Sequence, residues 1–194
     1  MHNNQKIIAV VGMCGAGKSE VADIFVKAGF EYLRFGQITL DEIKRRGLEP
    51  KEENEKPIRE EFRKKHGMAA FAILNMPKIG DLIQQGKNVL VDGLYSWSEY
   101  KVLKSKYQEK LFVLAVYAPP HLRYERLDNR RLKYKDDPNM KYRSFSPAEA
   151  KSRDYAEIEN VEKAGPIAMA NFTVVNTGSL AQLNEQVERI IRQL

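Results

Sequence analysis

Residues 7–19 constrain the fold of this chain more than any other stretch. Five apolar residues run directly into Gly12, and the pattern G-x-x-x-x-G-K-S then ends at Ser19. Between a buried strand and a helix, such a glycine-rich turn directs successive backbone N–H groups inward, where they can bind phosphate oxygens. The sequence therefore predicts a phosphate-binding loop between a first strand and a first helix.

The loop is expected to supply most contacts to a bound nucleotide. The N–H groups that open the following helix, together with its positive dipole end, favour anions. Lys18 would bridge the outer phosphates, and the Ser19 hydroxyl would bind Mg²⁺. The predicted nucleotide-binding residues are Gly12, Met13, Cys14, Gly15, Ala16, Gly17, Lys18, Ser19 and Glu20.

Apolar strand-like segments alternate with helical patterns along the whole chain. The strand-like segments are residues 7–11, 30–35, 87–91, 111–117 and 172–176. The intervening helices are predicted at residues 20–28, 37–46, 57–75, 76–85, 96–107, 120–131, 146–163 and 179–194. Alternation of this kind favours a parallel sheet covered on both faces. The expected fold class is therefore α/β, a three-layer α/β/α arrangement around a five-stranded parallel sheet.

The predicted domain is a single unit with two additions. The core comprises residues 1–36, 87–132 and 164–194, with a helical insertion at 37–86 that would bind an acceptor and a lid at 133–155. Ligands of such sheets bind beyond the carboxyl ends of the strands. Asp92 ends the third predicted strand beside the loop, so we expect its carboxylate to bind Mg²⁺ together with Ser19.

Basic residues are concentrated in one window of the chain. The formal net charge is +6, and residues 120–153 hold ten Lys or Arg against five acids. Guanidinium groups attract phosphate. Arg126 and Arg130 share a helix face, and Arg153 follows a polar connection at 133–146, as expected of a hinged lid. A solvated face with ion pairs inside the helix is the alternative interpretation.

Composition and the termini indicate the cellular compartment. The longest apolar run falls short of the roughly 20 residues that span a bilayer, and MHNNQK at the start lacks the apolar core of a secretory signal. A single cysteine, Cys14, excludes an internal disulfide. We expect a cytoplasmic protein without a membrane partner.

Several segments resemble a known group of kinases. They are GMCGAGKSE in the loop, RGLEP followed by EN, HGMAA before PKI, VDGLYSWSEY at 91–100, APP with RYERL at 118–127, SRDYAEI at 152–158, and VVN before GS. The chain resembles the nucleoside-monophosphate-kinase group of P-loop kinases, and within it a family of small adenylate-kinase-related proteins common in archaea. The resemblance implies ATP and Mg²⁺ as cofactors. It implies phosphate contacts from the lid for Arg126, Arg130 and Arg153, which join Lys18 as predicted catalytic residues.

The acceptor side departs from the adenylate-kinase pattern. The turn after the second strand, Gly36-Gln37-Ile38-Thr39-Leu40, lacks the acid and the arginine that those kinases offer to the acceptor nucleotide. No arginine follows Asp92 and Gly93 closely, although relatives usually have one there. The candidates that would bind the acceptor instead are Arg34, Arg59, Arg63 and Gly93.

Four functional hypotheses remain open at this point. The first is a phosphotransferase that moves the γ-phosphoryl group of Mg-ATP to a nucleotide-like acceptor. The second is a dephospho-coenzyme A kinase, which shares the architecture and the loop. The third is an adenylate-kinase-like ATPase that assists RNA or ribosome assembly, suggested by the basic window. The fourth is a nucleotide-binding regulator without catalysis. The chain has no N-K-x-D motif for guanine, which favours ATP over GTP.

Overall fold

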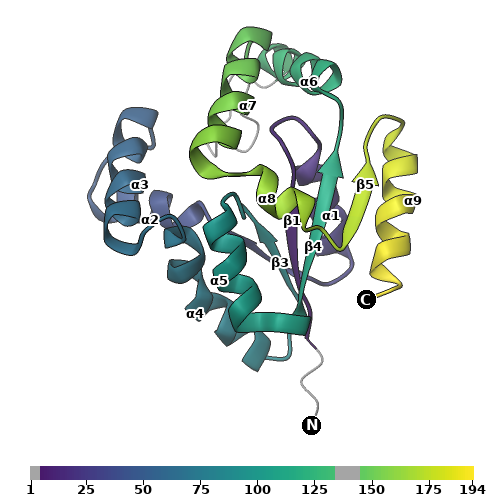
Figure 1. Cartoon of the computed structure of the whole chain (residues 1–194), viewed down its shortest axis with the longest axis horizontal. Helices are drawn as coiled ribbons and strands as arrows, with labels where there is room; N and C mark the ends of the chain where they lie inside the picture. Colours follow the sequence, from purple (N-terminus) through teal and green to yellow (C-terminus); the bar gives the residue numbers. More distant parts are fainter. Residues whose placement is uncertain (1–4, 134–144) are drawn as a thin grey trace.

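The five strands form one parallel sheet. The computed structural model describes residues 5–133 and 145–194, and the strands occur in the order β2-β3-β1-β4-β5 (Figure 1). They are β1 (Ile7–Val11), β2 (Glu31–Arg34), β3 (Val89–Asp92), β4 (Leu111–Tyr117) and β5 (Phe172–Val175), and all neighbouring pairs are parallel. The predicted five-stranded parallel sheet is confirmed.

Register brings the ends of three strands to the same level. Val10 of β1 and Arg34 of β2 both pair with Asp92 of β3. The residue that follows each strand therefore leaves the sheet at the same edge. This alignment places the glycine-rich loop (residues 12–19), Asp92 and Arg34 next to one another.

Helices cover both faces of the sheet. On one face, α1 (Lys18–Lys27) and α9 (Leu180–Ile191) pack through Phe25 and Val187, both fully buried. On the other, α4 (Ala70–Gln84), α5 (Trp97–Tyr107) and α8 (Ala164–Ala168) bury residues such as Ile79 and Leu103. Every residue of β1 is buried, as expected of a central strand between two helical layers. The three-layer α/β/α fold is confirmed.

Four helices lie beyond these layers, around the carboxyl end of the sheet (Figure 1). They are α2 (Gln37–Arg45), α3 (Glu52–His66), α6 (Pro120–Lys133) and α7 (Pro147–Val161), and a short 3₁₀ turn, Gln108–Lys110, precedes β4. Ser146 and Glu149 form a capping box at the start of α7, where the sequence predicts a helix to begin. Within the described ranges, no helix is long and apolar enough to cross a membrane.

The prediction of one helix over residues 57–75 was wrong. The chain forms α3, which begins at Glu52, and α4, which begins at Ala70 and continues through Pro77. Gly67 separates them, because its backbone adopts a φ of 73° while its N–H still bonds the carbonyl of Arg63. A left-handed glycine at this place ends a helix. Pro57, at which the predicted helix begins, lies inside α3, and Pro77 lies inside α4.

Part of the predicted lid lies outside the described residues. The proposed lid covers 133–155, and residues 134–144 fall in the gap between the two described ranges. The part that the structure describes is Phe145 and the first turns of α7. The division into core, insertion and lid therefore remains a proposal.

A buried ion pair joins α6 to α7 and to the loop. The guanidinium of Arg123 donates to both carboxylate oxygens of Asp154, at 2.9 and 2.6 Å. It also donates to the backbone carbonyls of Ala118 and Cys14. Both charged side chains are at least nine-tenths buried, so each depends on the other to offset the loss of water.

We expect Asp154→Asn to lower the free energy of unfolding by about 3–5 kcal/mol, because it leaves the Arg123 guanidinium buried without a countercharge. Urea unfolding of the purified variant measures the change. Glu185→Gln removes a carboxylate from the exposed pair with Arg189 and serves as the control, with little expected effect. Equal stability of both variants and the parent would contradict the role given to Arg123.

Candidate functional site

One cavity of about 790 Å³ opens at the carboxyl end of the sheet. We call it the ligand cavity. The loop, the ends of β2 and β3, and parts of α2, α3, α6 and α7 line it. The sequence-predicted residues in its lining are Cys14, Gly15, Gly17, Lys18, Ser19, Arg34, Arg59, Arg63, Asp92, Gly93, Arg130 and Arg153. The tertiary structure thus brings together candidates from most of the chain.

The loop conformation requires glycine at two crowded positions. Gly15 and Gly17 have φ values of 80° and 104°, which side-chain-bearing residues rarely adopt. A Cβ on Gly17 would lie 2.1 Å from the Asn176 amide nitrogen, and one on Gly15 would lie 2.7 Å from the Arg123 carbonyl oxygen. Gly17 also precedes α1 without a side-chain cap. The first N–H groups of α1 are therefore left for an anion in the cavity.

Lys18 projects from the first turn of α1 back over the loop. Its ammonium donates to the carbonyls of Gly12 at 2.9 Å and Met13 at 3.2 Å. Burial, followed by repulsion from Lys163, lowers the pKa of Lys18 to about 8. A phosphate group in the cavity would relieve both effects, since it supplies the missing countercharge.

Asp92 ends β3 and lines the ligand cavity together with the loop. Its Oδ2 accepts a hydrogen bond of 2.7 Å from the Tyr32 hydroxyl, and burial together with this carboxylate raises the pKa of Tyr32. Ser19 and Asp92 both line the ligand cavity. One hydroxyl and one carboxylate, completed by phosphate oxygens and water, suit Mg²⁺, which is held by few protein ligands. The described residues contain no group of three or more His, Cys, Asp or Glu side chains that could hold a metal ion.

A carboxylate at the inner end of α7 connects three cations. Glu157 accepts from Arg153 Nε at 2.9 Å and from Lys163 Nζ at 2.5 Å. Its charge also acts on Lys18, and these interactions lower the pKa of Glu157 against the effect of its burial. Glu162 ends α7 with a φ of 53°. The chain then turns, and the buried Lys163 lines the ligand cavity, with its ammonium over the Tyr95 ring.

Other arginines from the basic window have different neighbours. Arg126 does not line the ligand cavity and donates to the carbonyl of Asn176 at 2.9 Å. Arg123, which precedes it by one turn, is buried in the pair with Asp154 described above. Of the arginines predicted to contact phosphate, only Arg130 and Arg153 line the cavity. The helical spacing of these residues was read correctly, but helical spacing does not say which side faces a ligand.

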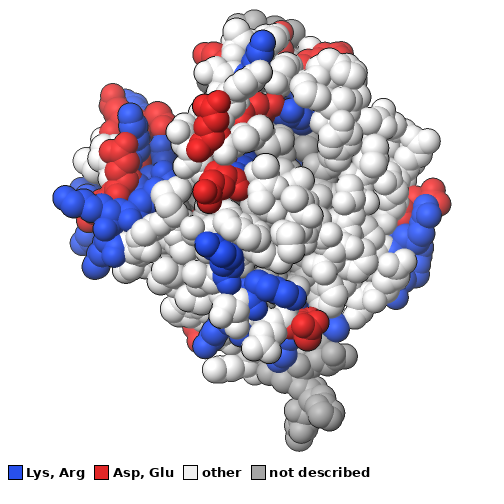
Figure 2. All heavy atoms as spheres, viewed as in Figure 1, with Lys and Arg blue, Asp and Glu red and all other residues white. Residues whose placement is uncertain are grey.

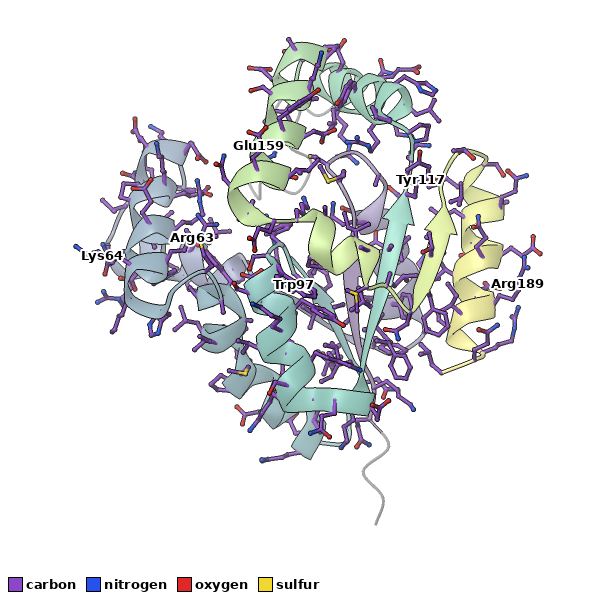
Figure 3. The ribbon with its side chains drawn as sticks, viewed as in Figure 1. Arg63, Lys64, Trp97, Tyr117, Glu159 and Arg189 are labelled. Carbon is purple, nitrogen blue, oxygen red and sulfur yellow. The ribbon has the colours of Figure 1, made fainter. Side chains whose placement is uncertain are left out.

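The opposite side of the cavity contains both acids and bases. We call it the α2–α5 wall, formed by Thr39, Glu52, Glu55, Arg59, Arg63, Lys78 and Glu99. Arg59 is paired with Glu55 and Glu52. Arg63 lies on the inner side of α3, over the Phe71 ring, whereas Lys64 points outward (Figure 3). Burial raises the pKa of Glu99 to about 7, although two backbone N–H groups bond its carboxylate.

The residues missed by sequence reasoning gave weak local signals. Arg153 and Glu157 are four residues apart in one helix, so their ion pair could have been predicted from the sequence. Lys163 lies beyond the end of that helix, and Tyr32 lies in an edge strand. Nothing in their immediate sequence indicates that they reach Glu157 and Asp92.

We expect Lys163→Met to raise the pKa of Lys18 above its value of about 8. The substitution removes a repelling charge and leaves Glu157 free to attract Lys18, and both changes favour the protonated ammonium. An NMR pH titration of the Lys18 side chain measures the shift. Lys106→Met, on the exposed part of α5, is the control, and an unchanged Lys18 pKa in Lys163→Met would refute the coupling.

Comparisons with solved structures agree with this architecture. A dephospho-CoA kinase from Campylobacter jejuni superposes with a TM-score of 0.55 and 17% identity, over 98% of this chain and 97% of the other. A shikimate kinase from Acinetobacter baumannii gives 0.54 and 19%, over 97% and 94%. At these identities the likeness establishes the P-loop kinase fold and nothing finer.

Sequence comparisons identify nearer relatives. The model of the AAA domain family AAA_18 matches residues 8–155. A UPF0200 protein from Thermococcus sibiricus is 33% identical over 189 residues, covering 97% of this chain and 95% of the relative. A UPF0200 protein from Aeropyrum pernix is 34% identical over 191 residues, covering 97% and 94%. The chain carries an AAA_18-type P-loop domain and belongs to the UPF0200 family.

Proposed function

We propose that this protein is an ATP-dependent phosphotransferase that moves the γ-phosphoryl group to a nucleotide-type small molecule. One observation supports this above all: Lys18 and the open N-terminus of α1 share a single cavity with Asp92, Arg130 and Arg153. Phosphoryl transfer needs alignment of the reactants and neutralisation of charge more than covalent help. The cavity offers both, and its volume lies within the usual range for small-molecule sites.

Each group would have a distinct task. The loop N–H groups and Lys18 would bind the β- and γ-phosphates. Ser19 and Asp92 would hold Mg²⁺, which neutralises charge on the phosphates when bound. Arg130 and Arg153 extend from α6 and α7 into the same cavity as the loop and would stabilise charge on the moving group. Glu157 would orient Arg153 and Lys163 toward the phosphates.

Two further functions stay in view. Transfer to a hydroxyl, as in a dephospho-coenzyme A kinase, is favoured by the fold of the Campylobacter jejuni enzyme. An RNA-dependent ATPase was suggested by the basic window, but Arg123 and Arg126 make contacts inside the protein. If RNA stimulated ATP hydrolysis, and this stimulation fell steeply as the salt concentration rose, the RNA-dependent ATPase would be favoured.

We expect Lys18→Met to weaken Mg-ATP binding about ten- to hundredfold, because a charge-assisted bond to phosphate is lost. Isothermal titration calorimetry measures the affinity, and radiolabelled γ-phosphoryl transfer to a panel of acceptors measures activity. Lys106→Met, remote from the cavity, is the control. Absence of ATP binding by the parent protein would refute the proposed function.

We also expect ATP affinity to fall as the pH rises above about 8, the pKa of Lys18 without ligand. Below that pH Lys18 is already charged, whereas above it binding must recover a proton. The loss approaches about tenfold per pH unit until the pKa of the bound state is reached. Calorimetry between pH 7 and 9.5 tests this, and Lys18→Met should remove most of the dependence.

A further inference from the structure

We propose that the acceptor atom is a hydroxyl oxygen, carried by a hydroxyl-rich molecule with at most one negative charge at the α2–α5 wall. The phosphate of a nucleoside monophosphate is excluded as acceptor. This inference rests on the proposed function and narrows its acceptor, at the same site, from nucleotide-type molecules in general to those that present a hydroxyl group and carry at most one negative charge at the wall.

The arginine best placed to bind an acceptor phosphate is already neutralised. Arg59 Nη1 donates to Glu55 at 2.7 Å, and Arg59 Nη2 pairs with Glu52. The Glu55 carboxylate is buried, with 3% of the residue exposed. If Arg59 turned to a phosphate, Glu55 would stay buried beside the incoming dianion without this partner, which is strongly unfavourable.

Of the other two cations of the wall, one has a carboxylate within ion-pair distance. Lys78 lies 3.6 Å from Asp41, whereas Arg63 lies over the Phe71 ring and makes no ion pair within the described ranges, although its charge acts on Glu99. Figure 2 shows acidic and basic side chains side by side on the upper part of the α3 region and mostly basic ones at its lower end, where the last turn of α3 carries Arg63, Lys64 and Lys65. A phosphate dianion normally needs more than one uncompensated arginine or lysine, and on this wall Arg63 alone lacks an ion pair within the described ranges.

The same groups suit hydroxyl ligands. Glu52 and Glu55 are acceptors for O–H donors. Thr39 is 2% exposed and lines the cavity, and its hydroxyl oxygen has no hydrogen-bond partner among the described residues. A buried polar atom in this state points to a missing ligand or water. Arg34, at the end of β2, makes no ion pair within the described ranges and can bind a single negative charge, such as one carboxylate.

The reaction then has a simple balance. The acceptor hydroxyl oxygen forms a bond to the γ-phosphorus of ATP, and the bond from that phosphorus to the β–γ bridging oxygen breaks. The products are a phosphate monoester and ADP, and the hydroxyl proton is released to water. A monophosphate acceptor would instead give a phosphoanhydride, so the product distinguishes the two classes.

Paired acceptors test the proposal directly. The wild-type protein is incubated with labelled Mg-ATP and adenosine, cytidine, uridine or guanosine, each beside its 5′-monophosphate, and with D-gluconate as a singly charged polyol. We expect at least about hundredfold higher turnover of a hydroxyl acceptor than of any monophosphate, with a phosphate monoester as product by ³¹P NMR. Formation of nucleoside diphosphates would overturn the proposal.

Binding measurements decide the question even without turnover. With Mg-ADP saturating the donor side, wild-type protein should bind AMP at least tenfold more weakly than Glu52→Gln/Glu55→Gln, in which Arg59 is released. Glu53→Gln, on the exposed side of α3, is the matched control. Circular dichroism checks that each variant is folded. Glu52→Gln alone is a second test variant, because it removes only the exposed carboxylate of the two that pair with Arg59.

The outcomes separate the two proposals. Tight AMP binding by the wild type, or no gain in the glutamine variants, would overturn the inference while leaving an ATP-dependent phosphotransferase intact. Failure of the wild type to bind ATP would overturn the proposed function itself. Weak AMP binding that strengthens in Glu52→Gln/Glu55→Gln supports the assignment of the wall.

Discussion

The glycine-rich loop keeps its shape through a guanidinium that lies far away in the sequence. Arg123 holds the carbonyl of Cys14 inside the loop and is itself held by the carboxylate of Asp154. Asn176 adds a bond from its amide to the carbonyl of Ala16. The phosphate-binding conformation is therefore supported by α6, α7 and the end of β5, because side chains from all three bond its backbone.

The two sides of the ligand cavity differ in their balance of charges. Near the loop, cations outnumber acids: Lys18, Lys163 and Arg153 share the carboxylate of Glu157. A polyphosphate entering this side completes the charge balance. On the α2–α5 wall, Arg59 and Lys78 already have carboxylate partners, so this side offers less uncompensated positive charge to a second polyphosphate. This difference underlies the proposal that the two sides bind different ligands, one highly charged and the other largely neutral.

Helix boundaries and side-chain direction set the limits of sequence reasoning. The helix starts at Ser96 and Ser146 were predicted correctly, and both carry capping boxes, whose bonds form between near neighbours. The break at Gly67 was missed, and the predicted helix was started at Pro57 instead of Glu52. Arg126 shows the second limit. Its helical face was evident, but whether that face meets the cavity or Asn176 depends on how α6 docks.

The sequence by itself determined the five parallel strands, the phosphate-binding loop and the position of Asp92 at a strand end. These follow from short-range pattern: apolar runs, the spacing of glycines, and the rule that parallel strands share a carboxyl edge. Only the tertiary structure decided which charges neutralise one another. Lys163 meets Glu157 because Glu162 adopts a left-handed conformation. Arg123 meets Asp154 because α6 and α7 pack together. No local sequence pattern predicts either contact.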